Sequence, residues 1–339
     1  MVRKTPSESV RILALVKYVL KRIATGLVTF FFVIVLNFFI FWVMPGNPVQ
    51  IYIHNTHWNE EQIAHLMRVL GLDRPWYLLF FSYLVNVFTL NFGTSFTHFR
   101  PVSSMLLEAL PYTMLLLIPA TIGSIFLGMK LGAKSAWNYG KKSDLSTLIV
   151  SLVFYSMPVF WLGMFMILIF GFYFRLFPIA GVMSAQWLWV DPLSNPLVFV
   201  LDIVWHMVLP LMTLILYLFG GYYLIMRNTM LDTLTQDYIV TAKAKGASDN
   251  AIMYKHAQKN AMLPMITVVV LAFATIFSGA VLTETIFSWP GMGKLMYTAA
   301  LEQDYPVLWG TFSMLAMLVV IANIVADILY AYLDPRIRY

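Results

Sequence analysis

Long apolar runs separated by short polar intervals make up most of the chain. The first run, residues 23–44, has the roughly 20 residues that a helix needs to cross the hydrocarbon core of a bilayer. Similar runs lie at about 109–131, 148–174, 206–226, 264–287 and 307–333. This pattern predicts an all-α membrane protein with six transmembrane helices.

The interval between the first two predicted spans differs from the other intervals. Residues 45–108 mix polar and aromatic side chains, and the apolar stretch at 77–92 is short for a span and contains Asn86 and Thr89. We therefore expect 45–108 to form an extracytoplasmic subdomain lying on the membrane. The predicted parts are then an N-terminal cytoplasmic segment 1–22, a first transmembrane helix 23–44, this subdomain, and a transmembrane domain 109–339 with five helices.

Composition and charge agree with a membrane protein and indicate its orientation. Hydrophobic residues make up 60% of the 339 residues, charged residues make up 11%, and the mean hydropathy is +0.77, which leaves too little polar surface for a soluble globule. Six basic residues lie in 1–22, four in 130–142, five in 227–259 and two after 333, so 17 of the 22 share one side of the predicted topology. The positive-inside rule then places both termini in the cytoplasm.

The longest polar interval in the second half of the chain is the hairpin 227–263. Alanines such as Ala242 favour a helix, Gly246 stands where that helix would end, and Ser248 can cap the next helix. We expect a short helix, a glycine turn and a second helix running up to Pro264. The charge distribution places this hairpin in the cytoplasm, where a compact polar hairpin between two spans needs a surface to dock against.

Candidate catalytic and ligand-binding motifs are weak. The segment from Gly128 to Ser135 misses the phosphate-binding P-loop pattern because Ala133 stands where glycine is required, and it ends a membrane helix where a P-loop would open one. Cysteine is absent, and none of the six histidines forms a metal-ligand pair on a helix face. We therefore predict no catalytic residue, no metal site and no cofactor in this chain.

Two acidic residues within predicted spans are more informative, because a charge at membrane depth requires a partner or water. Glu284 lies near the end of the fifth predicted span, and Asp327 lies in the sixth, one turn after Asn323. These three residues either line a polar pathway or form bonds between helices or to a partner subunit. We favour the second interpretation.

The hairpin resembles a known family. Its run from Tyr238 to Gly246, followed by His256, Asn260 and Pro264, is similar to the cytoplasmic "EAA" loop of the permease subunits of ABC importers. Further motifs resemble the B-type permease of the dipeptide/oligopeptide/nickel branch in collinear order along nearly the whole chain. They are Met44–Pro48, Gly71–Pro75, Asn91–Ser95, Arg100–Val102, Leu110–Pro111, Phe177–Pro178, Glu284–Gly293, Asp304–Pro306 and Asp334–Arg336.

The resemblance implies a type I ABC importer permease fold in the plasma (inner) membrane of a prokaryote. Two permeases would form the pathway, two cytoplasmic ATPases would bind ATP and Mg, and an external solute-binding protein would deliver short peptides. The chain itself would be a non-catalytic subunit that binds no nucleic acid. Nickel chelates or oligosaccharides are alternative cargoes, and a stand-alone secondary transporter or channel is an alternative of another class.

The resemblance also implies which residues contact an ATPase. The short helix and turn of the hairpin would lie in a cleft of that subunit. Val240 and Thr241 stand where the family motif has glutamate and its first alanine, so we expect small residues and backbone shape to matter more than one charged contact. The predicted ATPase-coupling residues are Tyr238, Thr241, Ala242, Lys243, Lys245, Gly246, Ala247, Ser248 and Ile252.

Overall fold

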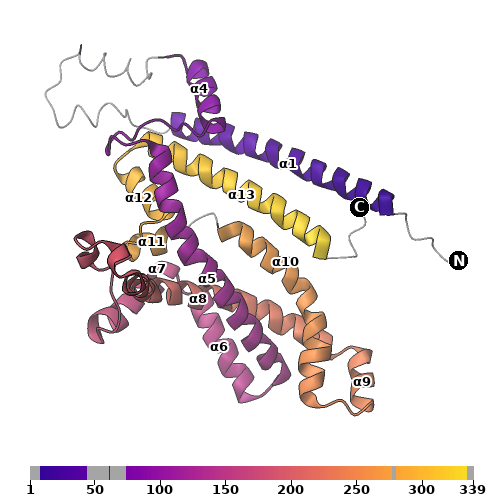
Figure 1. Ribbon diagram of the computed structural model, residues 1–339. Coiled ribbons are helices and arrows are strands. Elements are labelled where there is room, and N and C mark those ends of the chain that lie inside the picture. Colours follow the sequence, from indigo (N-terminus) through magenta and orange to yellow (C-terminus); the bar gives the residue numbers. More distant parts are fainter. Residues whose placement is uncertain (1–7, 44–60, 62–73, 277–279, 334–339) are drawn as a thin grey trace. The chain divides into compact units, whose positions relative to one another are not determined.

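The computed structural model describes residues 8–43, 61, 74–276 and 280–333, and these residues are almost entirely helical (Figure 1). Within them the only strand-like feature is an isolated bridge between Thr94 and Pro101. The all-α prediction is therefore confirmed for the described part of the chain. Much of the predicted subdomain 45–108 lies outside the described residues.

The described residues form thirteen α- and π-helical segments. They are α1 (Glu8–Val43), α4 (Trp76–Phe88), α5 (Val102–Trp137), α6 (Lys142–Ser156), α7 (Val159–Met166) with the π-helix Ile167–Tyr173, α8 (Pro196–Leu234), α9 (Asp237–Ala244), the π-helix Ala251–Gln258, α10 (Lys259–Thr275), α11 (Val281–Ile286), α12 (Met292–Leu301) and α13 (Tyr305–Leu333). Two short 3₁₀ turns, Ala185–Leu188 and Pro192–Ser194, precede α8.

Among the described residues, four helical stretches are long and apolar enough to cross a membrane. They are Lys17–Ile40, Val102–Trp137, Pro196–Leu234 and Tyr305–Ile328. A fifth exists if the bent pair Lys142–Ser156 and Val159–Tyr173 is one span. The predicted span 264–287 is divided between α10 and α11, with residues 277–279 outside the described part. Six spans and the N-in, C-in orientation therefore stay predictions.

The bend between α6 and α7 has a local cause. The two helices meet at 103°, and Pro158 directly precedes α7. Met157, the residue before this proline, has φ −76° and ψ 131°, the extended conformation that a following proline favours. Hydropathy alone cannot show such a bend, because an apolar run has the same composition whether it is straight or bent.

The described residues divide into two compact units, and the first comprises 1–111 with 291–339. Asn37 on α1 donates hydrogen bonds from Nδ2 to the Tyr83 hydroxyl of α4 (2.8 Å) and to Ser313 Oγ of α13 (3.2 Å). All three side chains are buried. Since unpaired polar groups are costly at membrane depth, this bonded triad fixes how α1, α4 and α13 meet.

A buried carboxylate organises the other end of the first unit. Asp304 precedes α13 and accepts hydrogen bonds from Ser95 Oγ (2.5 Å), the Thr97 backbone N–H (3.2 Å) and Thr97 Oγ1 (2.8 Å). Its own backbone carbonyl accepts from the Leu308 N–H (3.0 Å), so the residue also opens the helix. The loop before α5 is therefore tied to the start of α13.

The second unit, 112–290, is built on a close approach of α5 and α8. A Cβ atom at Gly128 would lie 2.6 Å from Tyr222 Cβ, and one at Gly132 would lie 2.7 Å from the Tyr223 carbonyl oxygen. Gly220 of α8 likewise lies against the Ser151 carbonyl of α6, where a Cβ would be 2.8 Å away. The glycines of the P-loop-like segment thus serve backbone-to-backbone helix packing.

Replacing Gly132 by leucine is expected to separate α5 from α8. Because the nearest atom is backbone, it cannot rotate aside, and overpacking of this kind costs about 1–3 kcal/mol. We expect a lower melting temperature of the detergent-solubilised protein. Ile122→Leu, at an exposed position of the same helix, serves as the control and should leave the melting temperature unchanged.

Candidate functional site

The predicted hairpin is a folded helix-turn-helix. After α8 ends at Leu234, α9 runs from Asp237 to Ala244, and Gly246 follows with φ +77° in the left-handed region that suits glycine. Ser248 Oγ accepts a hydrogen bond from the Ala251 N–H at 3.4 Å, at the start of the next helix. The predicted short helix, glycine turn and serine cap are confirmed.

The second helix of the hairpin differs from its prediction at its far end. The chain stays helical from Ala251 through α10 to Thr275, so Pro264 lies inside the helix and does not end it. Proline removes only one backbone donor, and membrane helices tolerate that loss where neighbouring groups satisfy the freed carbonyl. The hairpin therefore continues without a break into the apolar segment that follows it.

The predicted coupling residues fall into two groups. Ala242 and Ile252 are buried, and Ile252 packs with Ile239, Met226 and Met230 in one apolar cluster beneath the hairpin. Ala247 is partly buried against that cluster. The exposed members are Tyr238, Thr241, Lys243, Lys245, Gly246 and Ser248. The exposed group is therefore open to direct contact with another protein, whereas the side chains of Ala242 and Ile252 are covered by the chain itself.

Two exposed apolar residues of the hairpin were missed by sequence reasoning. Val240 is 63% exposed and Tyr254 is 57% exposed, on the two helices that flank the glycine turn. An apolar side chain within a polar interval is a visible signal of such a site, and in the sequence Val240 stands out only as a departure from the family motif. Tyr238 is also fixed across the hairpin, because Asn260 Nδ2 donates a hydrogen bond to its hydroxyl at 2.8 Å.

A buried polar cluster lies where α8 enters the hairpin. Arg227 of α8 donates two hydrogen bonds to Asp144 of α6, from Nε to Oδ1 and from Nη2 to Oδ2, both at 2.9 Å. Ser135 of α5 donates to the same carboxylate and lies 2.6 Å from the Tyr223 hydroxyl. From the sequence, Arg227 counts only toward the charge distribution and Asp144 has no predicted role, although an isolated acid beside a basic loop is a usable signal.

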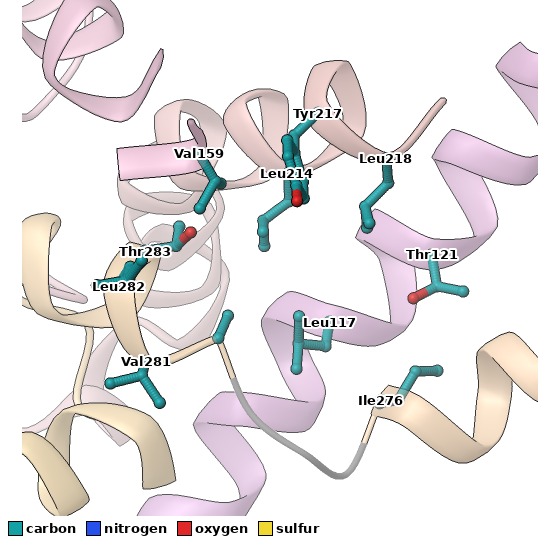
Figure 2. Close-up of a pocket in the computed structure, with 11 residues that line it drawn as sticks. Leu117, Thr121, Val159, Leu214, Tyr217, Leu218, Ile276, Val281, Leu282 and Thr283 are labelled. Atoms are coloured by element: carbon teal, nitrogen blue, oxygen red, sulfur yellow. The ribbon is translucent and has the colours of Figure 1, made fainter. Parts of the chain in front are cut away.

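A cavity of about 300 Å³ lies within the second unit (Figure 2). Its described lining is apolar apart from the hydroxyls of Thr121, Tyr217 and Thr283, and it includes no charged side chain. The lining comes from α5, α7, α8, the end of α10 and α11, and comprises Leu117, Thr121, Val159, Leu214, Tyr217, Leu218, Ile276, Ala280, Val281, Leu282 and Thr283. The cavity can hold a small solute by shape and by hydroxyl hydrogen bonds.

The candidate polar residues of the spans have partners in two places. Glu284 is fully buried in the second unit and accepts a hydrogen bond from Thr113 Oγ1 of α5 at 2.9 Å. In the first unit Asp327 Oδ2 lies 3.3 Å from Arg22 Nη1, which joins α13 to α1, and Asn323 is exposed. The choice between pathway and inter-helix roles stays a prediction. Among the described residues, no group of three metal-ligating side chains was found.

Comparison with known proteins places the chain in a family. Residues 120–339 match the model of the binding-protein-dependent transport system inner membrane component, and residues 15–117 match the N-terminal model of the same kind of membrane component. The chain belongs to this family. Together with the relatives described next, this match confirms the resemblance to B-type permease subunits of the dipeptide/oligopeptide branch and the multi-pass inner-membrane localisation.

Three relatives match over almost their full length. The di/tripeptide transport system permease protein DppB of Pseudomonas aeruginosa (strain UCBPP-PA14) is 34% identical over 96% of this chain and 99% of the relative. The oligopeptide transport system permease protein AppB of Bacillus subtilis (strain 168) is 33% identical over 95% and 99%. The dipeptide transport system permease protein DppB of Escherichia coli (strain K12) is 33% identical over 96% and 99%.

Replacing Gly246 by alanine is expected to loosen the hairpin without a steric clash. No atom lies within 4 Å of the position that a Cβ would take, but φ is +77°, where an L-residue pays about 1–2 kcal/mol. Hydrogen exchange of the backbone amides in 237–252 should become faster. Lys245→Ala, at the neighbouring exposed residue with φ −79°, is the control and should not change that exchange.

Proposed function

We propose that the chain is the permease subunit of an ATP-driven importer of short peptides. The observation that carries the proposal is full-length similarity to relatives named as di-, tri- and oligopeptide permeases, in a chain with a folded polar hairpin. The partners are a second homologous permease, two cytoplasmic ABC ATPases and an extracytoplasmic solute-binding protein. The ATPases bind ATP and Mg and perform the hydrolysis, and this subunit is not catalytic.

The hairpin is the contact with one ATPase. Covering an exposed apolar side chain with a partner protein is favourable, because it removes apolar surface from water. Val240 and Tyr254 are both more than half exposed. Ile252 belongs to the apolar cluster beneath the hairpin and Ala242 is also buried, so a force on the exposed residues moves the hairpin as one body. A rigid helix pair transmits such a displacement better than a flexible loop.

The cavity is this subunit's part of the pathway. Peptides share a backbone of hydrogen-bonding groups and differ in their side chains, so a pathway for many peptides needs hydroxyls and apolar surface without a fixed charge. The lining of Thr121, Tyr217 and Thr283 among aliphatic residues has this character. Six spans with both termini in the cytoplasm complete the proposed topology, with the first span 23–44 followed by the extracytoplasmic subdomain 45–108.

The cargo and the assembly can be tested together. We expect affinity purification of this chain from its own host, with its genomic neighbours expressed, to yield a second permease and two ATPase copies. In proteoliposomes with the binding protein, the assembly should import labelled di- or oligopeptides only when ATP is present on the ATPase side. ATP-dependent uptake of nickel chelates or oligosaccharides without peptide uptake would assign the alternative cargo, and transport by the isolated chain would contradict the importer.

Charge placed on the hairpin should prevent ATPase docking. Tyr254→Asp puts a carboxylate into the proposed contact, and a buried unpaired charge costs several kcal/mol, so we expect the ATPases to be lost from the purified complex. The protein should still insert and melt normally, because Tyr254 is exposed in this chain. Ser146→Asp, at an exposed position of α6 outside the hairpin, is the matched control. Retention of the ATPases by Tyr254→Asp would refute this docking surface.

A further inference from the structure

The ion pair between Asp144 and Arg227 is unusually enclosed for charged residues. Its side chains are only 6% and 12% exposed, and the guanidinium and carboxylate meet through two parallel hydrogen bonds of 2.9 Å. Such a bidentate ion pair has one favourable geometry, whereas apolar contacts allow two helices to slide along each other. A buried pair of this kind is weak as a source of net stability, so its placement calls for another explanation.

Every remaining acceptor site of the carboxylate is used by a different part of the unit. Ser135 of α5 donates to Oδ1, and the Gly140 N–H of the turn between α5 and α6 donates to Oδ2 at 3.2 Å. The Arg227 guanidinium also lies over the Tyr139 ring, 5.5 Å from its centroid. One carboxylate thus joins the end of α5, the turn, the start of α6 and α8.

Along α8, the pair lies between the cavity and the helix-turn-helix of the hairpin. The cavity residues Leu214, Tyr217 and Leu218 precede Arg227, and α9 follows the end of α8. On the hairpin side, Met226 and Met230 of α8 pack with Ile239 and Ile252. On the cavity side, α6 leads through Pro158 into Val159 of α7, a lining residue.

We infer that Asp144 and Arg227 are a positioning pair that transmits hairpin movement to the cavity wall. When a docked ATPase displaces α8, α6 moves with it because the ion pair links the two helices. The movement of α6 then displaces Val159. The inference rests on the proposed function, since it takes the hairpin as the site of ATPase contact. It assigns a role to two residues that touch neither the cavity nor the exposed part of the hairpin.

The test uses the complete importer in proteoliposomes, with peptide uptake and ATP hydrolysis measured in the same vesicles. Arg227→Lys keeps the positive charge but cannot form the bidentate hydrogen bonds. The double variant Asp144→Asn/Arg227→Gln removes both charges, so that no unpaired charge stays buried. Both are expected to assemble and hydrolyse ATP, while the ATP consumed per peptide imported rises about tenfold. Glu108→Gln, which breaks the exposed ion pair of Arg100 and Glu108, is the control and should leave the ratio unchanged.

A second readout follows the movement itself. The chain contains no cysteine, so Val159→Cys provides a unique thiol at the cavity. ATP should change its rate of maleimide labelling in the otherwise unaltered importer, and this change should disappear in Arg227→Lys. An ATP-dependent labelling change that persists in Arg227→Lys, with a normal ratio, would overturn the inference.

The remaining outcomes are also decisive. Failure of both pair variants to assemble would make the pair a folding requirement and would overturn a transmitting role. If the unaltered assembly hydrolyses ATP but imports no peptide, the proposed cargo fails, while the labelling comparison still tests the pair. The two failures are therefore distinguishable.

Discussion

The backbone contact between α5 and α8 is the constraint on which the second unit depends. In a bilayer, apolar side chains gain little by leaving lipid for a neighbouring helix, so association relies on close packing and polar bonds. Gly128 and Gly132 allow the packing, and the close approach brings Ser135 within reach of Tyr223 and of the Asp144 carboxylate. The same approach places Ala133 and Ala136 in the apolar cluster beneath the hairpin. A side chain larger than hydrogen at either glycine would disturb both the buried polar cluster and the apolar cluster beneath the hairpin.

Buried polar groups then determine which helices pair, since apolar surface in lipid is non-directional. In the first unit Asn37, Tyr83 and Ser313 do so, and Asp304 does so where the chain enters α13. In the second unit Asp144 and Glu284 have this role. Each of these groups bonds across at least two helices or a helix and a loop. This makes the pairing of segments far apart in sequence specific, whereas hydropathy specifies only that they lie in the membrane.

The sequence was sufficient for features that depend on local composition. Apolar runs located the helices, and the glycine turn at Gly246 followed from helix-ending rules and was observed with positive φ. Features that depend on tertiary contacts were not accessible. The run 148–174 gave no sign of the 103° bend, because Pro158 is also compatible with a kinked continuous helix. The predicted coupling residues include the buried Ala242 and Ile252, because motif similarity does not distinguish a contact residue from one that supports it. The role of Asp144 cannot be inferred from its neighbours in sequence, because its partner Arg227 is remote in sequence.

Under the proposed function, in which the cavity is part of the pathway, the absence of charge from its described lining has a further consequence for how cargo is chosen. Thr121, Tyr217 and Thr283 offer hydroxyls that can bond to almost any peptide group, and the aliphatic residues around them discriminate only by size. Such a surface holds no cargo strongly, which favours rapid release and leaves little basis for rejecting a wrong molecule. Discrimination must then occur before the cargo reaches the membrane. Under the proposed function, a lineage could exchange one class of nutrient for another by altering the soluble receptor alone, while this subunit and its linkage to ATP hydrolysis stayed as they are.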